Sequence, residues 1–293
     1  MNPSFLFGLL LGMAAALMLN VGKGVQKQKV HVFLQGRRML RPPHRRDLGI
    51  WLLGMLLTAT AALPYSLALR LSESPSAISA MTGIGLVGLA LYAIKAIGER
   101  ASRLDAVGIG AVVLGTSALG YLGSSRQAAP RDFEDRTLVV SLCLLLGLAV
   151  LVALAGWLVR RIHGVAFGLA AGLLLGATVF LGDAALVRAG GDFFAQFDNP
   201  YPYVALGVGP LALFVTQLGF LRGRALEVVP ALNSTMIVTP LALERAVYGA
   251  LPGALQLGIV GLIVVGVVLL SLGAAGAAAA GPARRPVVEP SPR

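Results

Sequence analysis

The chain has 293 residues, of which 57% are hydrophobic and 13% are charged, and its formal net charge is +11. A soluble domain carries about 25% charged residues, so this composition excludes an ordinary soluble protein. Apolar segments of roughly 20 residues recur along the chain, enough to cross a bilayer as helices, whereas a membrane β-strand alternates over about 10 residues. We therefore predict an all-α, polytopic membrane protein.

The first apolar segment, residues 5–21, is preceded by no Lys or Arg but is followed by three lysines. A secretory signal peptide has its basic residues before the apolar stretch, so we expect a retained helix that enters the membrane from the outer side. For Lys23, just after this helix, two interpretations stay open. Its ammonium group either reaches the headgroups or faces an anionic solute.

Residues 22–47 are expected to form a loop with eight Lys and Arg residues, interleaved with apolar side chains such as Val30 and Val32. Such a segment is typical of a cytoplasmic surface that binds anionic lipids, with its apolar side chains among the headgroups. Basic loops in a membrane protein follow the positive-inside rule, so we expect no nucleic-acid partner.

Eight further spans are expected, at residues 48–69, 77–97, 106–122, 138–159, 164–182, 203–221, 226–243 and 250–272. In the second span we expect Trp51 to lie at the membrane interface and Pro64 to kink the helix. The nine spans form a single membrane domain, residues 1–272. Residues 273–293 are rich in Pro and Arg and are expected to be a disordered cytoplasmic tail. Splitting the third or the eighth span would give ten helices.

The distribution of charge predicts the orientation. If nine spans alternate in direction, three quarters of the Lys and Arg residues fall on the side that holds the C-terminus. By the positive-inside rule this side is cytoplasmic. We therefore expect the N-terminus outside and the C-terminus inside the cell (inner) membrane.

Small and polar residues recur in the same order in the two halves of the membrane domain. The matching pairs are Gly8 and Gly168, Gly12 and Gly172, Gly22 and Gly182, Pro75 and Pro230, Ser79 and Ser234, and Met81 and Met236. The first repeat would cover residues 5–122 and the second 164–272, with 138–159 as a connector helix. These halves would have inverted topology, which is a recurring architecture of secondary transporters.

Several short motifs carry a family resemblance. They are Gly22-Lys-Gly-Val-Gln-Lys27, Gly98-Glu99-Arg100, Gly108 with Gly115, Val215-Thr216-Gln217, and Leu221 followed by Arg224-Ala225-Leu226. With these motifs the chain resembles the drug/metabolite transporter superfamily, as an EamA-like protein nearest the branch of NIPA-type magnesium transporters. The resemblance implies nine or ten helices in two inverted halves, with a solute path between them. The chain departs from the family in its longer basic segment and in Asn233-Ser-Thr235, where the family pattern suggests an Ala-Ser pair.

Polar side chains inside the seventh and eighth spans are the main candidates for a binding site. Gln217 carries an amide that is costly in hydrocarbon unless it is paired, so it either joins helices or binds solute. The same alternatives hold for Asn233, Ser234 and Thr235, which follow Pro230; a proline can free a backbone carbonyl for a ligand. The remaining candidates for solute binding are Thr216, Thr178, Asn20 and Tyr65.

These observations favour a secondary transporter or facilitator of a small polar solute, with a magnesium or other divalent-cation transporter as the alternative. No carboxylate lies at the centre of any predicted span, which weakens the magnesium interpretation. A second alternative is a membrane protein that does not transport but binds or regulates a partner. No catalytic triad, P-loop or metal-ligand spacing occurs, so we expect no enzyme, cofactor or metal site, and we leave a homodimer open.

Overall fold

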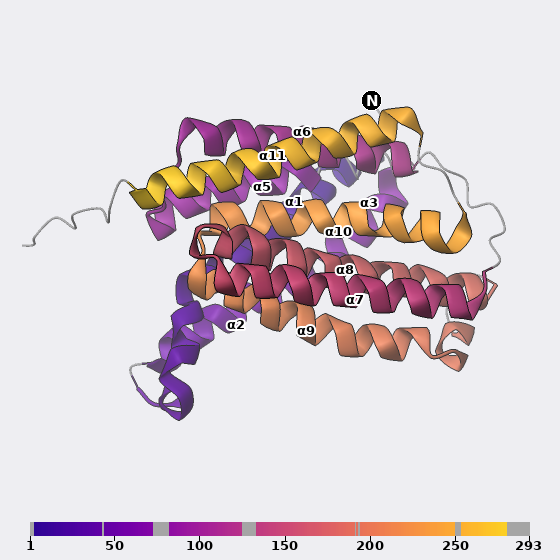
Figure 1. Cartoon of the computed structure of the whole chain (residues 1–293), viewed down its shortest axis with the longest axis horizontal. Helices are drawn as coiled ribbons and strands as arrows, with labels where there is room; N and C mark the ends of the chain where they lie inside the picture. The colour runs from indigo at the N-terminus through magenta and orange to yellow at the C-terminus, as the bar shows by residue number, and fades with distance from the viewer. Residues whose placement is uncertain are drawn as a thin grey trace, which may run out of the picture.

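The computed structural model describes residues 3–42, 44–72, 82–124, 133–190, 192, 194–249 and 253–279, and it contains no strand within these ranges. In the described residues, seven helical segments are long and apolar enough to cross a membrane. The protein is therefore an all-α, polytopic membrane protein, as predicted (Figure 1).

The helices and the shorter helical turns follow one another with brief connections. In chain order the helices are α1 (Pro3–Lys29), α2 (His44–Thr60), α3 (Ala62–Ser72), α5 (Thr82–Tyr92), α6 (Arg103–Ser124), α7 (Asp135–Leu158), α8 (His163–Arg188), α9 (Tyr201–Arg222), α10 (Ala225–Tyr248) and α11 (Ala254–Ala279). The shorter turns are Val30–Leu40, Ala93–Ile97, Arg160–Ile162 and Ala195–Asp198.

Helix α1 is longer than predicted, because it continues to Lys29 instead of ending near residue 21. A Cβ atom on Gly22 would lie 2.5 Å from Thr58 Oγ1 and 2.8 Å from the carbonyl oxygen of Gly54, so α1 and α2 meet at this glycine in close backbone contact. The predicted loop 22–47 is thus helical at its start. The placement of Val30 and Val32 among the headgroups is also wrong, since both side chains are buried in the protein.

Two other predicted boundaries have clear outcomes. Helices α2 and α3 are interrupted at Ala61, which agrees with the kink predicted from Pro64: a proline cannot donate to the carbonyl four residues earlier and its ring clashes with it. Helix α11 continues to Ala279, so the start of the predicted disordered tail is helical. Residues 280–293 and the start of the predicted third span, 77–81, lie outside the described residues.

The helices pack in two groups that meet at α10. Helix α8 contacts α7, α9 and α10, while α1 contacts α2, α3 and α5, and α6 pairs with α11. In Figure 1, α6 and α11 run along one side of the bundle, α7 and α9 along the opposite side, and α10 lies between them. The similar surroundings of α1 and α8 suit the proposed repeat, which stays a prediction.

The contact between α8 and α10 depends on one stripe of small residues. A Cβ atom on Gly168 would lie 2.4 Å from the carbonyl oxygen of Val228, and one on Gly172 would lie 2.3 Å from that of Leu232. The glycines therefore allow close helix–helix packing in a membrane, where the hydrophobic effect does not drive association.

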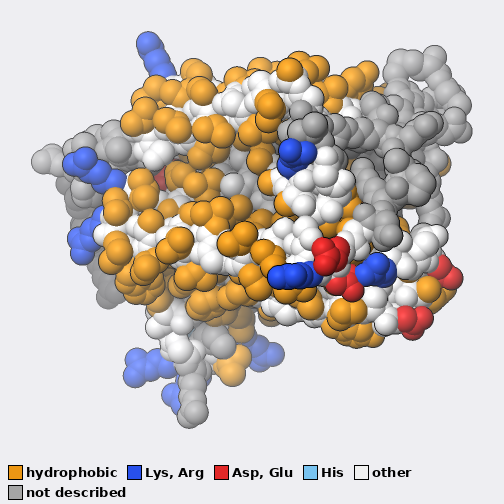
Figure 2. Space-filling model, turned by 45° about the vertical axis from the view of Figure 1, so that its right-hand side comes forward, with side chains coloured by type: hydrophobic (Ala, Val, Ile, Leu, Met, Phe, Trp, Pro, Cys, Tyr) orange, Lys and Arg blue, Asp and Glu red, His pale blue; other side chains and the backbone are white. Residues whose placement is uncertain are grey.

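The outer surface is apolar along the helices and charged near their ends (Figure 2). On α7, Leu144, Val150 and Leu151 are all more than 60% exposed. Exposed apolar side chains at this density are unfavourable in contact with water and favourable in contact with lipid acyl chains.

At one end of the bundle, which we call the basic end, basic side chains join several segments. There, α1, α7 and α9 end while α6, α8 and α10 begin. Lys27 donates to the backbone carbonyls of Phe220 and Gly223, and Arg224 donates to the carbonyl of Arg100 at 2.7 Å. These bonds join the end of α1 to the turn between α9 and α10. They also join that turn to the residues that follow the Ala93–Ile97 turn.

Candidate functional site

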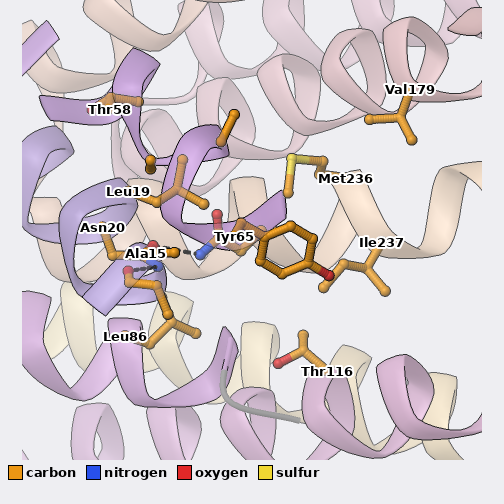
Figure 3. A pocket seen from close by; sticks show the side chains of 14 residues that line it. Ala15, Leu19, Asn20, Thr58, Tyr65, Leu86, Thr116, Val179, Met236 and Ile237 are labelled. Carbon is orange, nitrogen blue, oxygen red and sulfur yellow. Dashed lines mark hydrogen bonds between the residues drawn. The ribbon is translucent and has the colours of Figure 1, made fainter. Parts of the chain in front are cut away.

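A cavity of about 450 Å³ lies inside the bundle, between α1, α2, α3, α5, α6, α8 and α10. Most of its wall is apolar, formed by side chains such as Leu19, Leu86, Met236 and Ile237. Figure 3 shows Asn20 on one side of the cavity and Met236, Ile237 and Thr116 on the other, with Tyr65 between them. The polar side chains that line the cavity are Asn20, Thr58, Tyr65, Thr116 and Asn233.

The polar end of the cavity is a chain of three buried side chains. Asn233 Nδ2 donates to Asn20 Oδ1 at 2.7 Å, and Lys23 Nζ donates to Asn233 Oδ1 at 2.8 Å. Asn20 Nδ2 in turn donates to the carbonyl oxygen of Ala16 at 3.1 Å. This chain joins α1 to α10 through hydrogen bonds that the low local dielectric strengthens.

Lys23 is only 5% exposed, so the interpretation in which it reaches the headgroups is wrong. Helix α1 continues for almost two turns beyond it, which leaves Lys23 inside the bundle, three residues from Asn20 on the same face. Among the described residues no carboxylate forms an ion pair with its ammonium group. A buried cation with only neutral partners is costly, and an anion bound nearby would reduce that cost.

Gln217 lies outside the cavity wall and joins three helices. Its Nε2 atom donates to Gln26 Oε1 at 2.9 Å, and its Oε1 atom accepts from Trp51 Nε1 at 3.1 Å. Gln26 Nε2 donates to Thr58 Oγ1 at 3.1 Å, which extends the chain of hydrogen bonds to the cavity wall. Trp51 is buried, packs edge to face against Phe33 and pairs with Gln217, so it faces protein and not lipid. Its predicted position at the membrane interface stays a prediction.

The other four candidate side chains are hydroxyl groups that bond to backbone carbonyls, mostly within their own helix. The acceptors are Ala212 for Thr216, Leu174 for Thr178, Pro230 for Ser234, and Ala231 with Leu169 for Thr235. This is a common arrangement for hydroxyl side chains in membrane helices. None of the four is among the side chains that line the cavity.

The structure therefore brings together Asn20, Tyr65 and Asn233 of the eight predicted residues. It adds Thr58 and Thr116, which the sequence did not distinguish from other threonines in apolar spans. The signal for the polar end was present in the sequence as the spacing of Asn20 and Lys23, which places both on one face of a helix. That signal was weak because the end of α1 could not be located.

A second buried polar cluster lies at the basic end. Asp105 is 0% exposed and pairs with Arg224, whose Nη2 atom lies 3.0 Å from Asp105 Oδ1. Arg224 also pairs with Glu227 through its Nε atom. The guanidinium group of Arg224 is therefore held between two carboxylates.

Glu99 connects this cluster to the start of α10. Its carboxylate accepts from the backbone N–H groups of Ala225 at 2.6 Å and Leu226 at 3.1 Å. A carboxylate at a helix N-terminus satisfies donors that have no partner inside the helix and interacts favourably with the helix dipole. Burial raises the pKa of Glu99, while these two donors and the charges of Lys27 and Arg224 act in the opposite direction.

No protein-family model matches the chain, and no curated protein or solved structure matches it either. The resemblance to the drug/metabolite transporters therefore stays a prediction that rests on the motifs quoted above.

The chemistry available in the cavity is that of binding. The described residues contain no group of three or more His, Cys, Asp or Glu side chains that could hold a metal ion. The cavity offers apolar contact to most of a small molecule and hydrogen bonds at one end, next to a buried positive charge. This combination suits a solute with an apolar body and an anionic or carbonyl-bearing head.

Proposed function

We propose that the protein is a secondary transporter or facilitator of a small solute, with the cavity as its binding site. The observation that supports this most is the cavity of about 450 Å³ within a bundle of membrane helices, whose polar end joins α1 to α10. Asn233 lies eight residues into α10, roughly 12 Å along the helix axis at a rise of about 1.5 Å per residue. If α10 begins at the membrane surface, this distance places Asn233 within the hydrocarbon layer, where transporters bind their solutes.

The surroundings of Lys23 favour a neutral or anionic solute over a divalent cation. Its ammonium group is one hydrogen bond from the cavity wall and has no carboxylate partner among the described residues. Magnesium prefers carboxylate oxygens, and a positive charge at short range in a low dielectric repels a cation. We therefore place the magnesium alternative second to an organic solute with a carboxylate or a carbonyl group.

We also infer the orientation from charge. The basic end carries Lys27, Arg160, Arg161, Arg222 and Arg224, and basic residues mark the cytoplasmic side of membrane proteins. This end would face the cytoplasm in a cell membrane, and the start of α1 would lie outside.

The test is uptake by purified protein in liposomes, with a panel of monocarboxylates, amino acids and sugars and with magnesium as a separate arm. We expect uptake of at least one organic class, and we expect Asn233→Leu to reduce it about tenfold or more, because the substitution removes both hydrogen bonds that organise the polar end. The matched control is Thr178→Val, a polar-to-apolar change on a side chain outside the cavity wall.

Two results would overturn the proposal. One is the absence of uptake for every solute by folded protein, which would favour the alternative of a non-transporting partner protein. The other is uptake that Asn233→Leu and Thr178→Val change equally, which would remove the cavity as the binding site.

A further inference from the structure

A second hollow, which we call the basic pocket, lies at the basic end and has a volume of about 420 Å³. It is formed by the end of α1, the turn between α7 and α8, and the turn between α9 and α10. It shares no lining residue with the cavity. Its basic lining residues are Lys27, Arg160, Arg161, His163, Arg222 and Arg224.

The positive charge of this pocket is only partly balanced. Glu227 is its single carboxylate, and it pairs with Arg224, which Asp105 also holds. Arg160 and Arg161 are both exposed, and no ion pair involves either of them in the described part of the chain. Two guanidinium groups therefore remain available at the pocket, and guanidinium groups bind phosphate oxygens in a bidentate manner.

The start of α8 adds a second attraction for an anion. Gly164, the second residue of this 26-residue helix, lines the pocket, and Ile162 before the helix makes no side-chain cap. The N–H groups at the start of a helix, together with the helix dipole, favour a negative charge. The equivalent donors at the start of α10 are occupied by Glu99. At the start of α8 the carboxylate of Glu227 lies close by, since a Cβ atom on Gly164 would be 2.4 Å from its Oε2 atom, and Arg224 pairs with this carboxylate.

The walls of the basic pocket are held in place. A Cβ atom on Gly223 would lie 2.2 Å from the Cα atom of Gly164, so the two turns touch through their backbones. Lys27 bonds to the carbonyls of Phe220 and Gly223, which fixes the turn between α9 and α10 against α1. A ligand would therefore meet a preformed site, which costs less to occupy than a flexible one.

The rim of the pocket is apolar on the side of α7. Trp157 and Leu158 are 54% and 71% exposed, and the guanidinium carbon of Arg222 lies 3.4 Å from the centre of the Trp157 ring. An acyl chain could lie on these side chains while its headgroup entered the pocket. A free phosphate compound could enter from the aqueous side.

We propose that the basic pocket is a binding site for an anionic phosphate group, which the two guanidinium groups of Arg160 and Arg161 and the start of α8 recognise together. The ligand is either the headgroup of an anionic phospholipid or a free phosphate compound. Its binding links the turn between α7 and α8 to the turn between α9 and α10. The site is separate from the solute cavity and does not depend on the proposed transport function.

The experiment has two arms that distinguish the sources of phosphate. In the first arm, the protein in phosphatidylcholine nanodiscs with a minor fraction of phosphatidic acid is released into native mass spectrometry, and the retained phosphatidic acid is counted. In the second arm, nanodiscs of phosphatidylcholine alone are titrated with inorganic phosphate while the melting temperature is recorded. Saturable binding in the first arm alone identifies a lipid site, and binding in the second arm identifies a site for free phosphate.

The double variant Arg160→Gln/Arg161→Gln is expected to lower the affinity in the responding arm on the order of tenfold. The matched control is Arg100→Gln/Arg103→Gln, which removes the same charge from two exposed arginines next to the start of α6, outside the pocket and outside the basic segment 22–47. The single variant Arg160→Gln should lower the affinity less, in the same direction, so the test does not depend on how well the double variant folds.

Two outcomes overturn the proposal. If the pocket variant and the control lose affinity equally, the binding reflects the general surface potential of a basic protein. If neither arm shows saturable binding by the folded protein, the pocket is not a phosphate site.

Discussion

Two basic side chains contact α10, the half-buried Arg224 and the buried Lys23, and their surroundings differ. Arg224, at the start of the helix, lies between Asp105 and Glu227. Lys23, which meets the helix two turns further along, donates to the neutral side chain of Asn233 and pairs with no carboxylate among the described residues. In the first cluster the cation has carboxylate partners within the protein, whereas in the second the described residues supply no negative charge. We infer that the first holds the helices together and that the second is where a ligand completes the site.

The largest effect on stability should come from removing Arg224, the cation that pairs with carboxylates. Arg224→Gln would leave Asp105 and Glu227 buried without their positive partner, and breaking one side of a buried ion pair costs about 3–5 kcal/mol. We expect a large fall in the melting temperature in detergent, or loss of folded protein. The matched control is Arg103→Gln, which removes an exposed arginine at the start of α6. Equal stability of the two variants would show that the cluster does not hold the basic end together.

Removing Lys23 should affect solute uptake more than stability. Lys23→Met keeps most of the volume but removes a buried charge that lacks an ion-pair partner in the described structure. We expect a much smaller change in melting temperature than for Arg224→Gln, because the removal of a buried charge offsets the loss of the donor to Asn233 Oδ1. Solute uptake should fall about tenfold or more, since a hydrogen bond to a charged group contributes roughly 1.5–3 kcal/mol.

Two results separate the roles of Lys23. Normal uptake with Lys23→Met in a folded protein would show that the positive charge does not act on the solute. A collapse of stability similar to that of Arg224→Gln would show that Lys23 is structural, and the contrast between the two clusters would be lost.

The sequence was enough to predict that the protein is an all-α membrane protein, because composition and segment length decide that class. Most helix positions were predictable for the same reason. The burial of Lys23 was not predictable, since it depends on where α1 ends. That boundary follows from the fit of Gly22 against Gly54 on another helix, a tertiary contact that helix propensity does not contain.

The sequence likewise predicted part of the candidate site, namely which polar side chains need a partner. An amide in an apolar span must find a partner, which predicted that Asn233 and Gln217 are hydrogen-bonded, as both are. Whether that partner is a ligand or another helix depends on which side chains face each span across the bundle. The basic pocket could not be predicted from the sequence. Its lining residues Lys27, Arg161 and Arg222 are far apart in the chain and come together only in the folded protein.

Gln217→Leu should separate a structural amide from a binding one. The substitution leaves Trp51 Nε1 and Gln26 Oε1 without their partners, and each buried unpaired group costs about 1–3 kcal/mol. We expect a lower melting temperature and, because Gln217 does not line the cavity, an unchanged solute affinity in the protein that stays folded. A loss of solute affinity as large as that of Asn233→Leu would instead extend the binding site to α9.

The smallest effect should come from an ion pair at the opposite end of the bundle, where Arg188 meets Asp135. The chemistry is that of Arg224 with Asp105, but both side chains are open to solvent, which solvates and screens the charges. Arg188→Gln should therefore leave the melting temperature close to that of the unmodified protein at physiological salt, with any difference shrinking as salt is added. A loss comparable to that of Arg224→Gln would mean that burial does not decide the strength of these pairs. The contrast between Arg224 and Lys23 would then rest only on their different partners, which are carboxylates for Arg224 and the neutral Asn233 for Lys23.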